Sequence, residues 1–237
     1  LWGGPDVVRI FFSVRFDKPF NSLNGWAGEK RLENIQELKG TTESTPRQSS
    51  GWSYHDAPTS GVSAQYKVGK GEQLQVKMAI SYVSIENAKE KLERECNHWD
   101  FDRVRNQSQQ EWNEWLGKID VDGGTDAQKI KFYTDLWHTL LGRHKLDDYN
   151  GEYPDYTTGE RVGSHTINAQ LKVRQLPRDK EEKPLHHMYN SDAFWLTQWN
   201  LNTLWALAYP SVLDDFAACL LQYDTNGGLL PRGPCAG

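Results

Sequence analysis

The chain has 237 residues, which is enough for one large or two smaller domains with a substantial buried core. Its formal net charge of −5 provides no general attraction to nucleic acid or anionic lipid, and no apolar run approaches the roughly 18 residues of a membrane-spanning helix. Aromatic residues make up 12% of the chain and include ten tryptophans, which suits a protein with flat binding surfaces. The three cysteines have no CxxC spacing, so neither a zinc motif nor a redox motif is favoured.

The first part of the chain has the patterns of strands and loops. β-branched and aromatic residues between Val7 and Phe16 predict a strand, and the Gly-, Ser- and Pro-rich residues 21–60 predict mostly loop. Residues 61–68 and 73–83 both alternate, with a tight turn between them, so we expect a β-hairpin with one half-buried face, as in antiparallel sandwiches. In the second strand that face carries Leu74, Val76, Met78, Ile80 and Tyr82.

At Ser84 the apolar period changes from two to that of a helix. Ser84 is a good N-cap, and the pattern that follows predicts a first helix and then a second that carries Trp112 and Trp115. Residues 120–124 predict a short strand or linker, where we expect a domain boundary. Thr125 and Gln128 then form a capping box that predicts a third helix.

Residues 147–184 form a long, polar connection, and connections of this length are usually functional or disordered. Residues 147–152 are acidic, but an EF-hand would need an acidic residue at Leu146 and a glutamate at Thr157, so we expect a polar turn. His186 and His187 are adjacent rather than four apart, which favours a loop pair over a metal site.

A tryptophan-rich segment runs from Ser191 to Pro210, and we expect a helix that Ser191 caps and Pro210 ends, with Ser211 capping the next helix. On that helix Trp195 and Trp199 share one face. Gln198 and Asn202 share another face nearby, and Asp192 lies in the first turn, where the helix dipole favours a carboxylate.

Two interpretations of this segment remain open from spacing alone. Core filling explains Trp205 and its leucine neighbours, because aromatic rings dominate core packing. Sugar binding explains the polar residues better, because buried polar groups need partners. Sugars stack their C–H faces on indole rings and pair their hydroxyls with carboxylates and amides. The candidate substrate-binding residues are Asp192, Trp195, Gln198, Trp199 and Asn202.

Several stretches together resemble glycoside hydrolase family 92, the calcium-dependent exo-acting α-mannosidases. Residues 80–95 with Trp99–Phe101 are the most specific part of the resemblance. The others are Arg9–Phe20, Trp112–Ile119, Phe132–Leu141, Asp147–Tyr153 and Gly227–Pro231.

The resemblance implies a multi-domain α and β fold in which an antiparallel β-sandwich is joined by helices to an (α/α)6 toroid. On this basis we expect residues 1–84 to be the C-terminal part of the sandwich, 85–123 the linker helices, and 124–237 the start of the toroid. The chain would then be an internal part of a longer protein, inactive by itself. The family also suggests a secreted, periplasmic or cell-surface location.

The implied activity is inverting, calcium-dependent hydrolysis of terminal α-linked mannose, for which a protonated carboxyl group and a carboxylate act on opposite sides of the sugar. In the family this carboxyl pair and most calcium contacts come from segments C-terminal to Gly237, so we assign no catalytic or metal-binding residue here. The expected partner is a glycan, with no nucleic acid and no membrane segment. The alternative, from the same aromatic surface, is a non-catalytic carbohydrate-binding or scaffold module.

One position departs from the family pattern. Where many members have a Trp-Asp-Thr-Tyr-Arg run, this chain has Trp195 to Trp199, with Leu196 in the aspartate position and Trp199 in the arginine position. A leucine cannot accept a hydrogen bond from a hydroxyl group. Asp192, one turn earlier, could replace it, and the sugar specificity is therefore expected to differ.

Overall fold

The computed structural model describes residues 9–39, 60–160, 170–190, 197–228 and 230–231, and additionally the backbone of the strand segments 4–5, 46–49, 52–55, 161–162 and 165–167. The chain divides into two units, one formed by residues 15–76 and the other by residues 1–14 together with 77–237. Neither unit coincides with a predicted domain, and the predicted domain division stays a prediction. No helix in the described ranges is long and apolar enough to cross a membrane.

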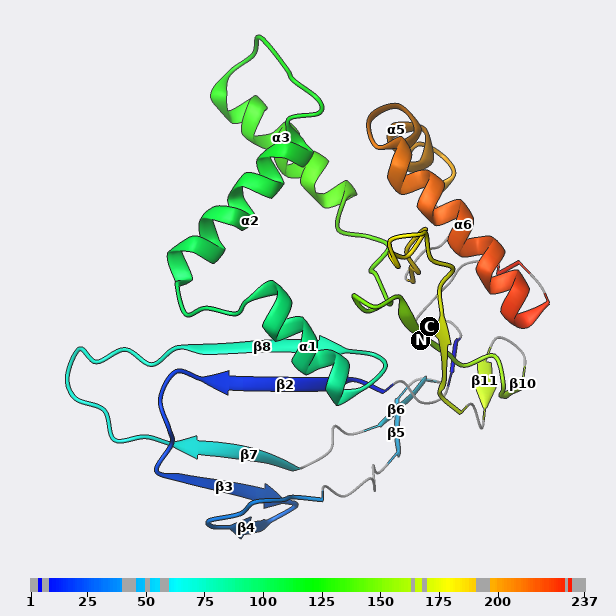
Figure 1. Cartoon of the computed structure of the whole chain (residues 1–237). Coiled ribbons are helices and arrows are strands. Elements are labelled where there is room, and N and C mark those ends of the chain that lie inside the picture. Colours follow the sequence, from blue (N-terminus) through cyan, green and yellow to red (C-terminus); the bar gives the residue numbers. More distant parts are fainter. Residues whose placement is uncertain are drawn as a thin grey trace. The chain divides into compact units, whose positions relative to one another are not determined.

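The unit of residues 15–76 contains a three-stranded antiparallel sheet. Its central strand is β3 (Ser22–Ala27), which lies between β4 (Lys30–Leu32) and β7 (Ser60–Gln65) (Figure 1). A tight turn at Gly28, with a φ of 61°, joins β3 to β4. Two further strands, β5 (Pro46–Ser49) and β6 (Trp52–His55), pair with each other. The stretch of residues 21–60 that the sequence predicts as mostly loop therefore contains four strands and the first residue of β7.

The predicted hairpin of residues 61–68 and 73–83 is also wrong. β7 pairs with β3, whereas β8 (Val76–Ser81) pairs with β2 (Phe11–Phe16). The alternating patterns did identify strands, but alternation does not choose a strand's partner. The predicted buried face is wrong as well, since Met78 is 62% exposed. The opposite face of β8 is the inner one, because Ser81 is buried and Lys77 Nζ donates to the Cys96 carbonyl oxygen.

The three predicted helices are confirmed, and local caps explain where they begin. They are α1 (Ile85–Glu95), α2 (Phe101–Leu116) and α3 (Asp126–Thr139). Ser84 Oγ accepts from the backbone N–H of Asn87, 3.0 Å away, and the capping box of Thr125 and Gln128 is complete. Each cap satisfies N–H groups that the first turn of a helix leaves without partners.

Short strands follow α3. β9 (Glu152–Asp155) pairs with β12 (Lys172–Gln175), and β10 (Glu160–Val162) pairs with β11 (His165–Ile167), both antiparallel. β1 (Gly4–Pro5) runs parallel to β11. The fold is thus a mixture of helices and small sheets, as the sequence predicts at this coarse level.

The tryptophan-rich segment differs from the predicted continuous helix. Residues 198–200 form a turn, and the helices that follow are α5 (Leu201–Ala208) and α6 (Pro210–Gly227). The predicted break between two helices at this place is confirmed, since α5 ends at Ala208. Pro210 itself is the first residue of α6, where its missing N–H is tolerated because first-turn N–H groups lack helical partners anyway. Ser211 is therefore not the cap. The predicted helix start at Ser191 lies outside the described residues.

Two apolar clusters lie within the unit formed by residues 1–14 and 77–237. One joins the segments after α3 to α6 and contains Leu146, Tyr153, Leu176, Met188, Tyr189, Phe216 and Cys219. The other joins α3 to the end of α5 and contains Leu136, Trp205 and Tyr209, with side chains of α2 packed against it. The expectation that Trp205 belongs to a core is confirmed, since it is 1% exposed. The space between these clusters contains the candidate site.

Candidate functional site

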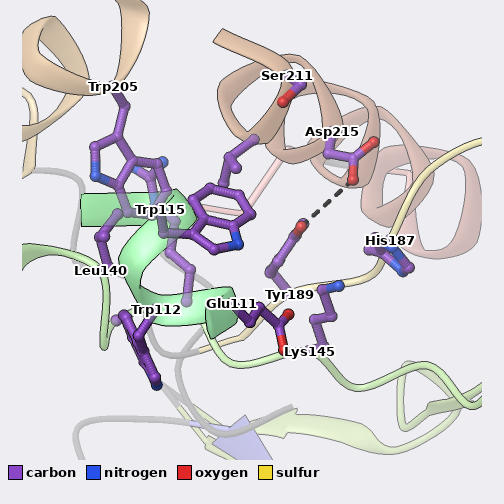
Figure 2. Close-up of a pocket in the computed structure, with 13 residues that line it drawn as sticks. Glu111, Trp112, Trp115, Leu140, Lys145, His187, Tyr189, Trp205, Ser211 and Asp215 are labelled. Atoms are coloured by element: carbon purple, nitrogen blue, oxygen red, sulfur yellow. Dashed lines mark hydrogen bonds between the residues drawn. The ribbon is translucent and has the colours of Figure 1, made fainter. Parts of the chain in front are cut away.

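A pocket of about 590 Å³ opens between α2, the segment after α3, residues 187–189 and the helices α5 and α6 (Figure 2). Its wall combines indole rings with ionisable side chains, which is the composition expected of a site for a polar organic ligand. The lining residues are Glu111, Trp112, Trp115, Leu140, Gly142, Arg143, Lys145, His187, Tyr189, Trp205, Ser211, Val212 and Asp215.

Backbone pairing between two distant segments builds one wall. The N–H of Leu146 donates to Met188 O at 2.9 Å, and Lys145 forms an antiparallel bridge with Tyr189. Because side chains alternate along extended segments, residues 145, 147, 187 and 189 point to one side, and Lys145, His187 and Tyr189 line the pocket there. Leu146 and Met188 point to the other side and are buried in the core.

His187 is held in this wall by a buried carboxylate. Its Nδ1 lies 2.8 Å from Oδ2 of Asp147, whose Oδ1 accepts from the backbone N–H of Met188 at 2.8 Å. Asp147 is 9% exposed, so its position is fixed by the fold. Pairing of Nδ1 with the carboxylate leaves Nε2 as the ring nitrogen that a ligand can contact.

Tyr189 and Asp215 form a second polar pair. Figure 2 shows the two side chains pointing toward each other, and the Tyr189 hydroxyl donates to Asp215 Oδ2 at 3.4 Å. Burial, and secondly the negative charge of Asp215, raise the pKa of Tyr189 above its ordinary value. Tyr189 therefore stays protonated at neutral pH and keeps its hydrogen-bond donor.

Arg143 connects the pocket wall to both C-terminal helices. It is 4% exposed, and its guanidinium carbon lies 4.5 Å from the Trp205 ring centroid and 3.8 Å from that of Phe216. Its Nη2 donates to Asn202 Oδ1 at 2.5 Å. Its φ of 59° is unusual for a residue with a side chain, and such strain persists only where surrounding contacts impose it.

The aromatic side of the pocket is supported from behind by further rings. Trp115 stacks on Tyr209 with ring centroids 5.7 Å apart, and the Tyr209 hydroxyl donates to the Trp115 carbonyl oxygen at 3.1 Å. Trp112 packs edge to face against Trp137 at 6.1 Å. These contacts fix two indole rings of α2 in the pocket wall.

A buried polar network anchors the turn that carries Asp147. The neighbouring Asp148 accepts from Ser81 Oγ and, at 2.8 Å, from Asn87 Nδ2, and its Oδ1 lies 2.6 Å from Lys91 Nζ. Glu152 closes the turn through a second bond from Asn87 Nδ2 at 2.8 Å. The acidic stretch that the sequence suggests as a polar turn is indeed a turn, bonded to β8 and α1.

The predicted substrate-binding residues are only partly placed. Asp192 and Trp195 lie outside the described residues, as does Leu196. Gln198 is exposed, Trp199 is 77% exposed, and neither lines the pocket. Asn202 is half-buried and bonded to Arg143, behind the wall. Their role in binding a sugar stays a prediction.

Sequence reasoning did not select the residues that do line the pocket. His187 was expected to be half of a loop pair, and Lys145, Tyr189 and Asp215 were not singled out. The available signal was the alternation around Leu146 and Met188, with an apolar residue between two polar or aromatic ones. Only the backbone pairing of these segments makes that alternation meaningful.

Metal binding finds no support in the described part of the chain, where no group of three His, Cys, Asp or Glu side chains could hold an ion. The two adjacent histidines contact protein groups: Nδ1 of His187 is directed at Asp147, and Nδ1 of His186 at the carbonyl oxygen of His187.

Comparison with known proteins gives a family match. Residues 87–237 match the family model described as the glycosyl hydrolase family 92 catalytic domain, which confirms the resemblance noted in the sequence. This range includes every residue that lines the pocket. No curated protein matches the chain with significance.

Solved structures share the fold. The chain is similar to a family GH92 inverting mannosidase from Bacteroides thetaiotaomicron VPI-5482, with a TM-score of 0.71 and 21% identity over 97% of this chain and 26% of that one. For a family GH92 alpha-mannosidase from Bacteroides thetaiotaomicron, also solved with mannoimidazole, the TM-score is 0.71 and the identity 20%, over 99% of this chain and 28% of that one. The glycosyl hydrolase ccman5 gives 0.69 and 16%, over 95% and 26%. The chain thus spans about a quarter of the length of these structures.

Proposed function

The chain belongs to glycosyl hydrolase family 92, and on this premise we propose that the protein removes terminal α-linked mannose from glycans. The observation that carries the proposal is that the match to the family's catalytic domain covers the whole pocket. The names of two similar structures, both mannosidases, support mannose as the sugar.

The pocket wall offers what a sugar ring needs. The indole rings of Trp112 and Trp115 give flat apolar surfaces for the C–H face of a pyranose. On the other side, Nε2 of His187 and the carboxylate of Asp215 can pair with hydroxyl groups. Charged acceptors make the stronger of these hydrogen bonds. Asp215 is therefore expected to orient the sugar, whereas the indole rings provide the apolar part of the affinity.

We propose that hydrolysis proceeds with inversion, as in the mannosidase named above. Inversion requires an acid that protonates the leaving oxygen and a base that activates water on the opposite face of the sugar. We assign neither role to a described residue. Residues of this chain would bind and orient the terminal sugar through the indole rings, His187 and Asp215, and the buried Tyr189 would hold Asp215 in place.

Calcium dependence belongs to the same proposal and rests on the family alone. The described residues gather no metal-binding cluster of His, Cys, Asp or Glu side chains. The predicted architecture also remains a proposal: the strands that precede α1 and the helices that follow it are consistent with a β-sandwich, linker helices and part of a toroid.

The test is mannose release by the full-length protein from a small aryl α-mannoside and from α-mannan, followed by NMR of the first sugar formed. We expect the β-anomer first, and loss of activity on calcium chelation that added calcium restores. Initial formation of the α-anomer would contradict inversion. Binding of α-mannan without any release of mannose would instead support the alternative, a non-catalytic carbohydrate-binding module.

A further inference from the structure

A single tryptophan lies on the open face of the three-stranded sheet in the unit of residues 15–76. Successive side chains of a strand point to opposite faces, so Ser22, Asn24 and Trp26 share one face of β3. The register places Arg31 of β4 and Gly61 of β7 directly beside Trp26. Trp26 is 43% exposed.

The two faces of this sheet differ. On the opposite face, a Cβ added at Gly25 would meet Ile35 Cδ1 at 2.7 Å and Leu38 Cδ2 at 3.2 Å, so residues 33–39 cover that side. The N–H of Ile35 donates to Leu23 O at 2.8 Å and holds the covering segment in place. Trp26 thus lies on the face of the sheet that residues 33–39 do not cover.

Gly61 gives the indole its position. A Cβ at position 61 would lie 2.5 Å from Cη2 and 3.1 Å from Cε2 of Trp26, so any side chain there would displace the ring. The glycine is required for space and not for its φ, which is not in the left-handed region. Contact with the glycine backbone supports one side of the indole and leaves the ring partly exposed on the groove side.

Hydrogen-bonding groups surround the ring. Asn24 Oδ1 accepts from the N–H of Asn34 at 3.0 Å, which orients the amide so that its Nδ2 is the group a ligand can reach. Ser22 Oγ donates to Gln65 Oε1 at 2.9 Å, which leaves the Gln65 amide nitrogen as a donor. Asn24 and Gln65 line a groove of about 740 Å³ together with Trp26, Arg31 and Ser63.

We propose that this groove is a second glycan-binding surface, which shares no residue with the pocket. A supported ring offers a stacking surface for the C–H face of a sugar, and the amide, hydroxyl and guanidinium groups can pair with its hydroxyls. Nucleobases also stack on tryptophan, but Glu29 and Glu33 in the groove outnumber Arg31, so a phosphate backbone is repelled. The charge pattern therefore selects a neutral polyol.

Native gel electrophoresis of the full chain in gels that contain α-mannan, xylan or β-glucan tests the proposal. We expect the wild type to be retarded in at least one gel, and Trp26→Ala to weaken that retardation roughly tenfold in apparent affinity, as for a central aromatic anchor. Gly61→Ala should have a similar but smaller effect, because it moves the ring and keeps it. Val62→Ala, next in β7 and 54% exposed on the opposite face, is the matched control and should behave as wild type.

Equal retardation of wild type, Trp26→Ala and Gly61→Ala, with native circular dichroism, would overturn the proposal. Absence of retardation of the wild type in all three gels, or an equal loss in Val62→Ala, would overturn it too. Mannose release from a small aryl α-mannoside by the full-length protein tests the proposed function separately. An inactive protein whose retardation depends on Trp26 would contradict that function and support the second surface.

Discussion

His187 Nδ1 and Asp147 Oδ2 lie 2.8 Å apart across an interval of 40 residues, in the wall of the pocket. The carboxylate is buried, and the His187 side chain is 38% exposed, so the pair has a fixed inner half and a reachable outer half. The imidazole is therefore oriented toward a ligand by a carboxylate from a distant segment, and not by the neighbours of His187 in the sequence.

The first prediction concerns this imidazole. His187→Ala should lower the affinity of the full-length protein for a mannoside roughly tenfold, as expected for the loss of one oriented hydrogen bond to a buried ligand. His186→Ala is the control, because Nδ1 of His186 contacts the backbone oxygen of His187 and the residue does not line the pocket. Calorimetric titration measures both. Equal effects of the two substitutions would remove His187 from the site.

The second prediction separates two roles for Asn202. Its oxygen accepts from Arg143, so Asn202→Ala should destabilise the fold by about 1–3 kcal/mol, because a buried charged donor loses one of its acceptors. A double-mutant cycle with Arg143→Ala, measured by urea unfolding, should give a coupling free energy of about 1–2 kcal/mol. Unchanged stability combined with weakened glycan binding would support the sugar-contact role predicted from the sequence instead.

The third prediction contrasts a buried ion pair with an exposed one. Asp148→Ala removes the carboxylate that pairs with Lys91 and leaves Asn87 with Glu152 as its acceptor, and should cost about 3–5 kcal/mol of unfolding free energy. Asp135→Ala removes the exposed partner of Lys131 on α3 and should cost less than about 1 kcal/mol. Urea denaturation of both variants checks the contrast. Similar unfolding free energies for the two variants would mean that the buried contacts of Asp148 contribute little to stability.

The fourth prediction concerns alkaline pH. Burial raises the pKa of the Cys219 thiol from its ordinary value of 9.0 to about 12. Since the folded chain holds this proton more tightly than the unfolded chain, the resulting stability is complete below about pH 9 and is lost as the pH rises toward 12. The unfolding free energy of the wild type should therefore fall more steeply above about pH 9 than that of Cys219→Ser, which does not titrate there. Parallel slopes for the two proteins would contradict a buried thiol with a raised pKa.

Much of the helical structure could be predicted from the sequence. Ser84 and Thr125 cap their helices through groups three residues away, so the signal and the structure lie in the same short window. The family resemblance could also be predicted, because it depends on residue identities along the chain and not on their arrangement in space.

The strand partners and the pocket could not be predicted. β7 has a good alternating pattern, but its partner β3 carries Asn24 and Gly25, which are poor strand formers. Ile35 and Leu38 pack against β3 at Gly25, and no short window of sequence indicates this contact. Likewise, Asn202 looked like a sugar ligand on a helix, and only the position of Arg143 shows that its oxygen has another partner.

By itself, the sequence determined the capped helices, the burial of Trp205 and the family, because each depends on local spacing or on residue identity. The tertiary structure alone decided that residues 145–147 lie beside residues 187–189, that Asp147 orients His187, and that Gly61 supports Trp26. The physical reason is that these contacts close long loops between extended segments. Their free energy depends on which partner covers which face, and no short window of sequence contains both partners.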